Sequence, residues 1–256
     1  MPRYFIELAY KGTAYNGWQR QPDTPTVQQV LEEGLGTLLR TPVQVTGAGR
    51  TDTGVHALFY IAHFDSPEIA DTADTVYHLN CILPCDISVF RIYRVPDSMH
   101  ARFDARYREY KYFIATRKDP FTRGLRWFVP VPLDVSAMQT AATKLMRFED
   151  FTSLAKLHSD NKTNLCTVYN ARWQRSGDEV IFTVGANRFL RGMVRAIVGT
   201  IVDVGRGKIT PRQFEQILEA RDRGAASGSA PPEGLFLSDI KYDMHHDKPA
   251  AGEEEK

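Results

Sequence analysis

This chain of 256 residues has few cysteines, little net charge and no long apolar run. Its three cysteines, Cys81, Cys85 and Cys166, form no even-numbered disulfide framework, which excludes the class of small disulfide-rich secreted domains. No apolar stretch approaches the roughly 20 residues that a membrane-spanning helix needs, and the N-terminal MPRYFIELAY lacks the apolar core of a signal peptide. We therefore expect a cytoplasmic protein that contacts no membrane.

Metal-ligating residues are also sparse. His78, Cys81 and Cys85 lie close together in the sequence, but a C-x₃-C pair without a second such pair is a poor zinc signal. Ordinary packing within a helix explains this spacing better, so we expect no metal site.

The net charge of +1 predicts no partner, but the charges are unevenly distributed. Residues 101–128 hold eight Arg or Lys and three acids, and residues 186–212 hold six and one, so each segment carries +5. Two basic segments indicate an anionic partner, with nucleic acid foremost, although two solvated faces would give the same counts. Residues 244–256 are expected to form an acidic, disordered tail.

The pattern of apolar residues predicts the element order βαββαβ twice, with one additional helix. In the first half we expect strands at 4–10, 43–45, 57–64 and from 86, and helices at 26–39, which Thr26 and Gln29 begin as a capping box, and 72–82. In the second half we expect strands at 107–115, 168–174, 179–185 and from 235, and helices at 134–146, 187–204 and from 210. The predicted fold is α+β, with two tandem ferredoxin-like halves, largely antiparallel sheets and a central positively charged cleft. The expected domains are residues 1–104, which carry the loop 47–57, and residues 105–243.

The loop 47–57, GAGRTDTGVHA, places Arg50, Asp52 and His56 among small residues before an apolar run. A dinucleotide fingerprint would need glycine where Asp52 stands, and a Walker A loop would need Lys and Ser or Thr where Val55 and His56 stand. An aspartic protease needs two carboxylates that share a proton, whereas this chain has one DTG tripeptide, beside an arginine. Two interpretations remain open. Asp52 is either a nucleophile or charge stabiliser at a sugar carbon, or it caps its own backbone in an Asx-turn and pairs with Arg50.

Further motifs favour the first interpretation. They are AYKGTAYNGWQRQ (9–21), TVQQVLEEGL (26–35), GRTDTGVHA (49–57), LNCILPCDISV (79–89), HARFDARYREYKY (100–112), EDFTSL (149–154), FLRGMVRAIVGTIVDVGRGK (189–208) and APPEGLFLSDIKY (230–242). In this order they resemble the motifs of the bacterial tRNA pseudouridine synthase A family, over residues 3 to 243.

The resemblance implies a homodimeric isomerase, without metal or cofactor, that converts uridine to pseudouridine at positions 38 to 40 of the tRNA anticodon arm. Asp52 matches the family's catalytic aspartate and Tyr110 the tyrosine that lies against the target base. Arg195 matches the arginine paired with the aspartate, and Arg50 the arginine associated with base extrusion. Cys166 stands where relatives usually have arginine, so one RNA contact of the family is not expected here.

The reaction breaks the bond from N1 to C1′, turns the uracil and joins C5 to C1′, so it has no redox step for a cofactor to serve. The carboxylate can attack C1′, add to C6 or assist formation of a glycal, and the sequence leaves these routes open. Arg188, Arg191 and Arg195 have the spacing of one helical face, which suits an ion pair with Asp52 and phosphate contacts. The ring of Tyr110 suits stacking on an extruded base. The alternative function is a non-catalytic RNA-binding or chaperone module of the same fold.

Overall fold

The computed structural model describes residues 1–156 and 162–243, so the predicted acidic tail lies outside the described residues. The strands are β1 (Arg3–Tyr10), β2 (Val45–Gly47), β3 (His56–Asp65), β4 (Ile87–Val95), β5 (Ala105–Ala115), β6 (Trp127–Phe128), β7 (Val168–Ser176), β8 (Glu179–Ala186) and β9 (Leu235–Tyr242). The helices are α1 (Val27–Leu39), α2 (Thr72–Ile82), α3 (Val135–Lys144), α4 (Met193–Gly205) and α5 (Pro211–Ala220). The element order predicted from the sequence is confirmed, with the two-residue strand β6 in addition.

Local signals explain where most helices begin. The Thr26 side chain accepts a hydrogen bond from the backbone N–H of Gln29 at the start of α1, and Asp134 caps α3 in the same way. At α5, Thr210 and Gln213 form a complete capping box, and Pro211 is the first helical residue.

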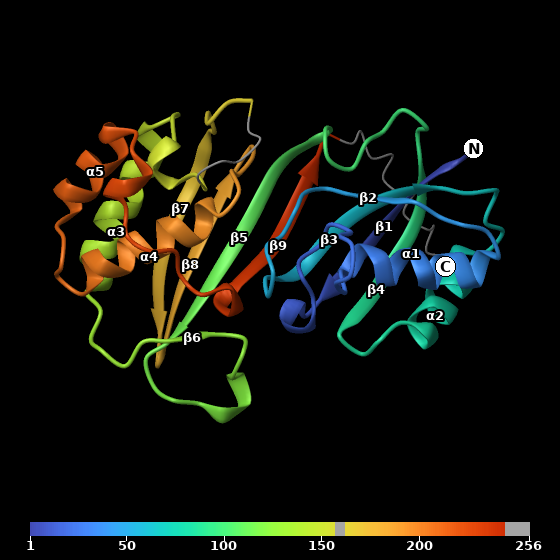
Figure 1. Ribbon diagram of the computed structural model, residues 1–256, viewed down its shortest axis with the longest axis horizontal. Coiled ribbons are helices and arrows are strands. Elements are labelled where there is room, and N and C mark those ends of the chain that lie inside the picture. Colours follow the sequence, from blue (N-terminus) through green and yellow to red (C-terminus); the bar gives the residue numbers. More distant parts are fainter. Residues whose placement is uncertain (157–161, 244–256) are drawn as a thin grey trace, which may run out of the picture.

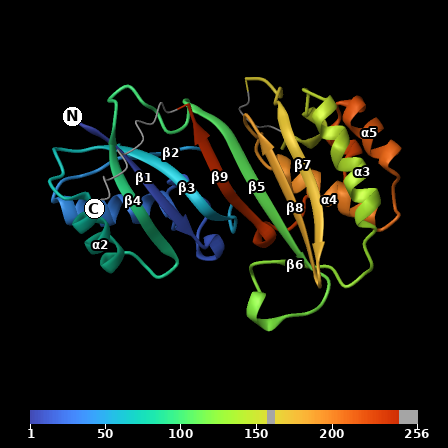
Figure 2. The ribbon, with the colours of Figure 1, turned by 180° about the vertical axis from the view of Figure 1, so that it is seen from behind.

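The strands form a single sheet in the order β4-β1-β3-β9-β5-β8-β7, with β2 beside β3 and β6 beside β5 (Figures 1 and 2). Apart from β6, the strands of each half follow the order fourth, first, third, second. The expectation of two separate sheets is wrong, because β3 and β9 pair in parallel, His56 with Phe236 and Ala57 with Leu237. A physical reason is that each half alone would expose an edge strand with unpaired backbone groups, and joining the two edges satisfies part of them.

Two hydrophobic clusters lie along this sheet, one in each half, and β9 contributes to both. Leu235 packs in the C-terminal cluster, whereas Leu237 and Ile240 pack in the N-terminal one. Figure 1 shows α1 and α2 beside the N-terminal strands and α3 to α5 beside the C-terminal strands, so that no helix of the described residues covers β5 and β9 between them. Residues of the two halves can therefore meet over these central strands.

One predicted helix begins later than expected. Instead of covering 187–204, α4 begins at Met193, because Gly192 before it has a left-handed conformation with φ of +71°. Arg188 and Arg191 therefore belong to the loop 187–192, and only Arg195 is helical. The expectation that these three arginines share one helical face is wrong.

Candidate active site

The aspartate loop, residues 48–55, joins β2 to β3 and is fixed by hydrogen bonds to the last residue of β1 and to the segment that follows it. The Tyr10 hydroxyl lies 2.9 Å from Thr51 Oγ1, and the backbone N–H of Gly54 donates to the Tyr15 carbonyl at 3.3 Å. Gly17 is required beside this loop, because its φ is +82° and a Cβ atom there would lie 2.3 Å from the Thr51 carbonyl oxygen. The backbone on both sides of Asp52 is thus held in place.

His56, at the start of β3, braces the same loop. Its Nδ1 accepts the backbone N–H of Gly12 at 2.9 Å, and its ring stacks on Phe236 with centroids 4.5 Å apart. Burial lowers the pKa of His56, which keeps the imidazole neutral. These contacts give His56 a bracing role rather than a free imidazole for proton transfer.

Asp52 lies against arginines of the other half of the chain. Arg195 Nη1 is 3.4 Å from Asp52 Oδ2, and Arg191 Nε is 3.8 Å from Asp52 Oδ1. The Arg195 side chain is 23% exposed and is anchored through Nε, which donates to the Ala230 carbonyl at 2.7 Å. Arg191 is 57% exposed. One carboxylate, itself 26% exposed, therefore faces two guanidinium groups.

The Asx-turn interpretation of Asp52 does not fit this geometry. In the described chain, no backbone N–H donates to the Asp52 carboxylate, and Arg50 forms no ion pair with it. Arg50 is exposed. The cations that accompany Asp52 are therefore Arg195 and Arg191 rather than its sequence neighbour.

Tyr110 lies on β5 and packs against both hydrophobic clusters. The ring of Phe189 meets it edge to face, with centroids 5.2 Å apart and an interplanar angle of 88°. Burial raises the pKa of Tyr110 to about 12; the Arg108 guanidinium opposes this shift and the Asp52 carboxylate adds to it. The hydroxyl is therefore a neutral phenol at physiological pH, close enough to Asp52 to sense its charge.

Arg188 and Cys166 are the other two positions singled out from the sequence. Arg188 is half-buried in the loop 187–192. The Cys166 thiol is only 2% exposed, within the C-terminal cluster, and burial raises its pKa to about 11. A side chain buried in this way offers no contact to a polynucleotide.

Two neighbours of this site were missed from the sequence. Arg108 donates hydrogen bonds to the carbonyls of Ala48 and Asn187, and Phe189 supports the Tyr110 ring. The strand period gave a signal for the first, because Arg108 stands two residues before Tyr110 and shares its face. Phe189 had only its place beside Arg188 as a signal.

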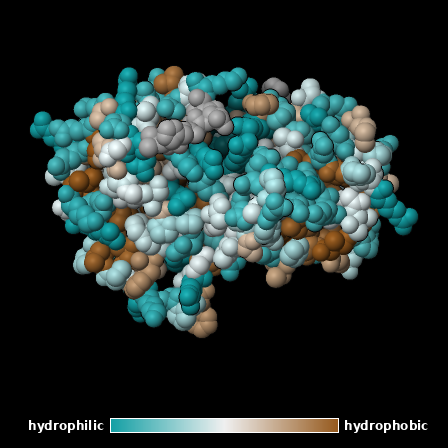
Figure 3. Space-filling view, viewed as in Figure 1, coloured by the Kyte–Doolittle hydropathy of each residue, from teal (hydrophilic) through white to brown (hydrophobic). Residues whose placement is uncertain are grey.

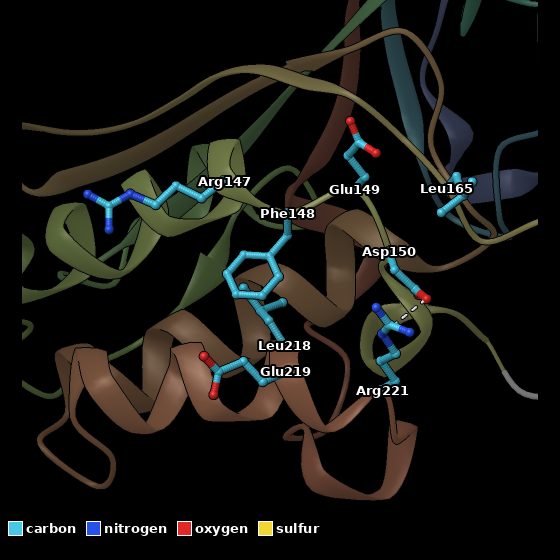
Figure 4. A pocket seen from close by; sticks show the side chains of 8 residues that line it. All are labelled: Arg147, Phe148, Glu149, Asp150, Leu165, Leu218, Glu219 and Arg221. Atoms are coloured by element: carbon cyan, nitrogen blue, oxygen red, sulfur yellow. Dashed lines mark ion pairs between the residues drawn. The ribbon is translucent and has the colours of Figure 1, made fainter.

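Hydrophilic residues cover most of the middle of the face seen in Figure 3. A separate pocket in the C-terminal half is lined by Arg147, Phe148, Glu149, Asp150, Leu165, Leu218, Glu219 and Arg221. Figure 4 shows the ion pair that joins Asp150 to Arg221 at its margin. None of the residues discussed above lines this pocket. Within residues 1–156 and 162–243, no three metal-ligating side chains come together, and no described helix is long and apolar enough to cross a membrane.

Comparison with known proteins identifies the family of this chain. A family model described as tRNA pseudouridine synthase matches residues 8–104 and 141–243. A tRNA pseudouridine synthase A of Parabacteroides distasonis is 51% identical over 243 residues, covering 94% of this chain and 96% of the relative. One of Bacteroides thetaiotaomicron is 50% identical over 245 residues, covering 94% and 91%. Among solved structures, a chain of a Cbf5-Nop10-Gar1 complex aligns at 12% identity and a TM-score of 0.34, covering 92% of this chain and 58% of that one. From the family model and the close relatives, this chain belongs to the tRNA pseudouridine synthase family and is an isomerase of that class.

Proposed function

We propose that this protein isomerises uridine to pseudouridine at positions 38 to 40 of the tRNA anticodon arm, with Asp52 as the nucleophile. The observation that carries this proposal is the contact of 3.4 Å between the Asp52 carboxylate and the Arg195 guanidinium. It supports the proposal because all three chemical routes, through C1′, C6 or a glycal, need an ionised carboxylate at the target nucleotide. Guanidinium is suited to this place because it stays charged when it is partly buried.

The proposed role of Tyr110 is to lie against the target uracil. A paired base is reached only after it leaves its stack, at a cost of about a few kcal/mol. Stacking on an aromatic ring recovers about 1–3 kcal/mol per base. The edge of Phe189 supports the Tyr110 ring from the side, so the ring is already oriented before the base arrives.

The other arginines suit the RNA backbone. Arg191, Arg188 and Arg50 belong to the two loops that meet at Asp52, and a guanidinium binds phosphate oxygens through paired hydrogen bonds. We propose that they contact phosphates or assist base extrusion, while Arg195 stays with the carboxylate. The RNA then follows a positively charged cleft over β5 and β9, between domains of residues 1–104 and 105–243. The family resemblance supports a cytoplasmic protein that forms a homodimer. Sedimentation of the purified protein tests whether it is a dimer.

The experiment is incubation with an unmodified tRNA transcript, followed by mapping of pseudouridine at single-nucleotide resolution. We expect modification at positions 38 to 40 with the wild-type protein and none with Asp52→Ala, which should still bind tRNA. Asp65→Ala is the matched control, because Asp65 also pairs with an arginine, Arg3, but at a distance from this site. Full turnover by Asp52→Ala would refute the role of Asp52. Binding without any modification by the wild-type protein would favour the RNA-binding module.

A further inference from the structure

We infer that Arg108 is a positioning residue for this reaction, whose guanidinium holds the aspartate loop and the loop 187–192 at a fixed separation through the carbonyls of Ala48 and Asn187. This inference rests on the proposed role of Asp52. Arg108 makes no contact with the substrate in this role. It acts through the two segments that carry Asp52 and lead to Arg195.

The four hydrogen bonds of Arg108 reach segments that are distant in sequence. Nη2 donates to the carbonyls of Ala48 at 2.9 Å and Arg102 at 2.8 Å. Nη1 donates to the carbonyls of Asn187 at 3.0 Å and Ala105 at 3.2 Å. Ala48 lies 60 positions before Arg108 and Asn187 lies 79 positions after it. One planar group therefore sets the distance between backbones of both halves of the chain.

These contacts bear directly on the placement of the ion pair. Ala48 begins the loop that carries Asp52, and Asn187 begins the loop that leads into α4 and Arg195. The Asn187 side chain extends the link, because its Oδ1 accepts the backbone N–H of Thr167 at 2.9 Å and that of Arg188 at 2.8 Å. A displacement of about 1 Å at a reacting group can cost about 10²-fold in rate.

The guanidinium of Arg108 lies among backbone carbonyls. Its guanidinium is partly buried with carbonyl acceptors alone, and burial lowers its pKa. In the described chain its hydrogen-bond acceptors are the four carbonyls and no carboxylate pairs with it, although a buried charge without an opposite charge is costly. Its positive charge is instead felt by Tyr110, whose pKa it draws downward against the effect of burial. The charge of Arg108 therefore acts on Tyr110 as well as on the backbone of the two loops.

The test compares Arg108→Lys with Arg3→Lys in the full-length protein. Lysine keeps the charge, but its ammonium is a single point that cannot reach carbonyls on two sides. Arg3 is the matched control, because it is also a partly buried strand arginine and donates to Asp65 and to the Met99 carbonyl, away from Asp52. The measurements are the single-turnover rate on an unmodified tRNA transcript, the Kd for that tRNA and the Tm.

We expect Arg108→Lys to slow the single-turnover rate by about 10²-fold, with the Kd within about threefold of wild type. Arg3→Lys should lower the Tm without slowing the rate. The inference is overturned if Arg108→Lys slows the rate no more than Arg3→Lys, or if its whole defect is in the Kd. A purely structural role would lower the Tm and the active fraction but leave the rate of the folded molecules unchanged.

A second variant keeps the test decisive if Arg108→Lys does not fold. Asn187→Ala removes the acceptor for Thr167 and Arg188 and loosens the other end of the same link. It should slow the single-turnover rate by at least about 10-fold with an unchanged Kd, and an unchanged rate contradicts the inference.

Asp52→Ala separates this result from the proposed function. If Asp52→Ala retains turnover, the proposed function fails, whereas an inactive Asp52→Ala beside a fast Arg108→Lys refutes only the role of Arg108.

Discussion

Arg195 and Asp52 are 143 positions apart in the chain, and their side chains meet at 3.4 Å. The aspartate comes from the loop before β3 in the first half, and the arginine from the first turn of α4 in the second. Neither half of the chain contains both groups, so the ion pair exists only when the single sheet joins them. The distance between Arg195 Nη1 and Asp52 Oδ2 is therefore a sensitive measure of whether the site is assembled.

The two arginines at Asp52 should differ in importance. We expect Arg195→Lys to lower the single-turnover rate by about 10²-fold, because the charge nearest to Asp52 is displaced and the anchor to the Ala230 carbonyl is lost. Arg191 is more exposed and more distant, so Arg191→Lys should cost less than about fivefold. Equal losses in the two variants would show that the cation is shared between them.

The sequence predicted the parts of this fold that local rules control. Thr26, Asp134 and Thr210 identified the helix starts, because a side chain that caps a helix acts within three residues of its own position. The join between β3 and β9 was not predictable, since it depends on two residue pairs, about 180 positions apart, that carry no local signature. Gly192 shows a different failure, because the helical spacing of the flanking residues concealed a left-handed glycine.

The site was less predictable from the sequence than the helix starts were. Spacing alone left Asp52 between a nucleophile and an Asx-turn, and only the resemblance to a family connected it to Arg195. The strand period places Arg108 on the same face as Tyr110, but its role was missed because its partners are backbone carbonyls, which any residue supplies.

The ring of Tyr110 should matter separately from its hydroxyl. Tyr110→Phe keeps the edge contact with Phe189, whereas Tyr110→Ala removes the surface on which a base would stack. We expect kcat/KM for the alanine variant to be about 5- to 150-fold below that of the phenylalanine variant, from a stacking contribution of about 1–3 kcal/mol. Steady-state kinetics on one tRNA transcript measures this ratio, and equal values would exclude stacking on Tyr110.

His63 should make the fold sensitive to acid. Burial, the charge of Arg3 and the neighbouring His100 lower the pKa of His63 from 6.5 to about 4, against the weaker attraction of Asp65 and Asp104. The folded state thus favours the neutral imidazole. The free energy of unfolding is therefore unaffected by the titration of His63 above pH 6.5 and decreases as the pH falls toward 4. The expected loss is up to about 3 kcal/mol.

Urea unfolding of His63→Asn between pH 7 and 4 measures that loss, because asparagine does not titrate in this range. The variant should show a smaller decrease in unfolding free energy than the wild type. His78→Asn is the control, since it makes the same replacement at an exposed position on α2. An identical pH dependence in all three proteins would mean that His63 titrates normally in the folded state.

Gly17 should be more sensitive to substitution than another glycine of similar backbone conformation. Gly17 has a φ of +82° and Gly177 a φ of +57°, so alanine strains the backbone at both by about 1 kcal/mol or more. At Gly17 the added Cβ would lie 2.3 Å from the Thr51 carbonyl oxygen, whereas at Gly177 no atom of the described residues lies within 4 Å. We expect Gly17→Ala to lower the Tm further and to slow turnover by at least about 10-fold, because Thr51 precedes Asp52. Comparable activity in the two variants would show that the aspartate loop tolerates displacement.

Binding of tRNA should weaken steeply with salt, and Arg50 should account for part of that dependence. Each phosphate contact contributes about 0.7–0.9 to the slope of log K against log salt, because counterions are released. Arg50→Gln should therefore reduce the slope by about 1 and weaken binding of different tRNAs to a similar extent.

Arg172 is the matched control. It is exposed on β7 between Ala171 and Trp173, both buried in the C-terminal cluster, so its side chain points to the opposite face of the sheet. Arg172→Gln should leave the slope unchanged. Equal changes in the two variants would mean that the slope reflects the overall charge of the protein rather than a contact beside Asp52.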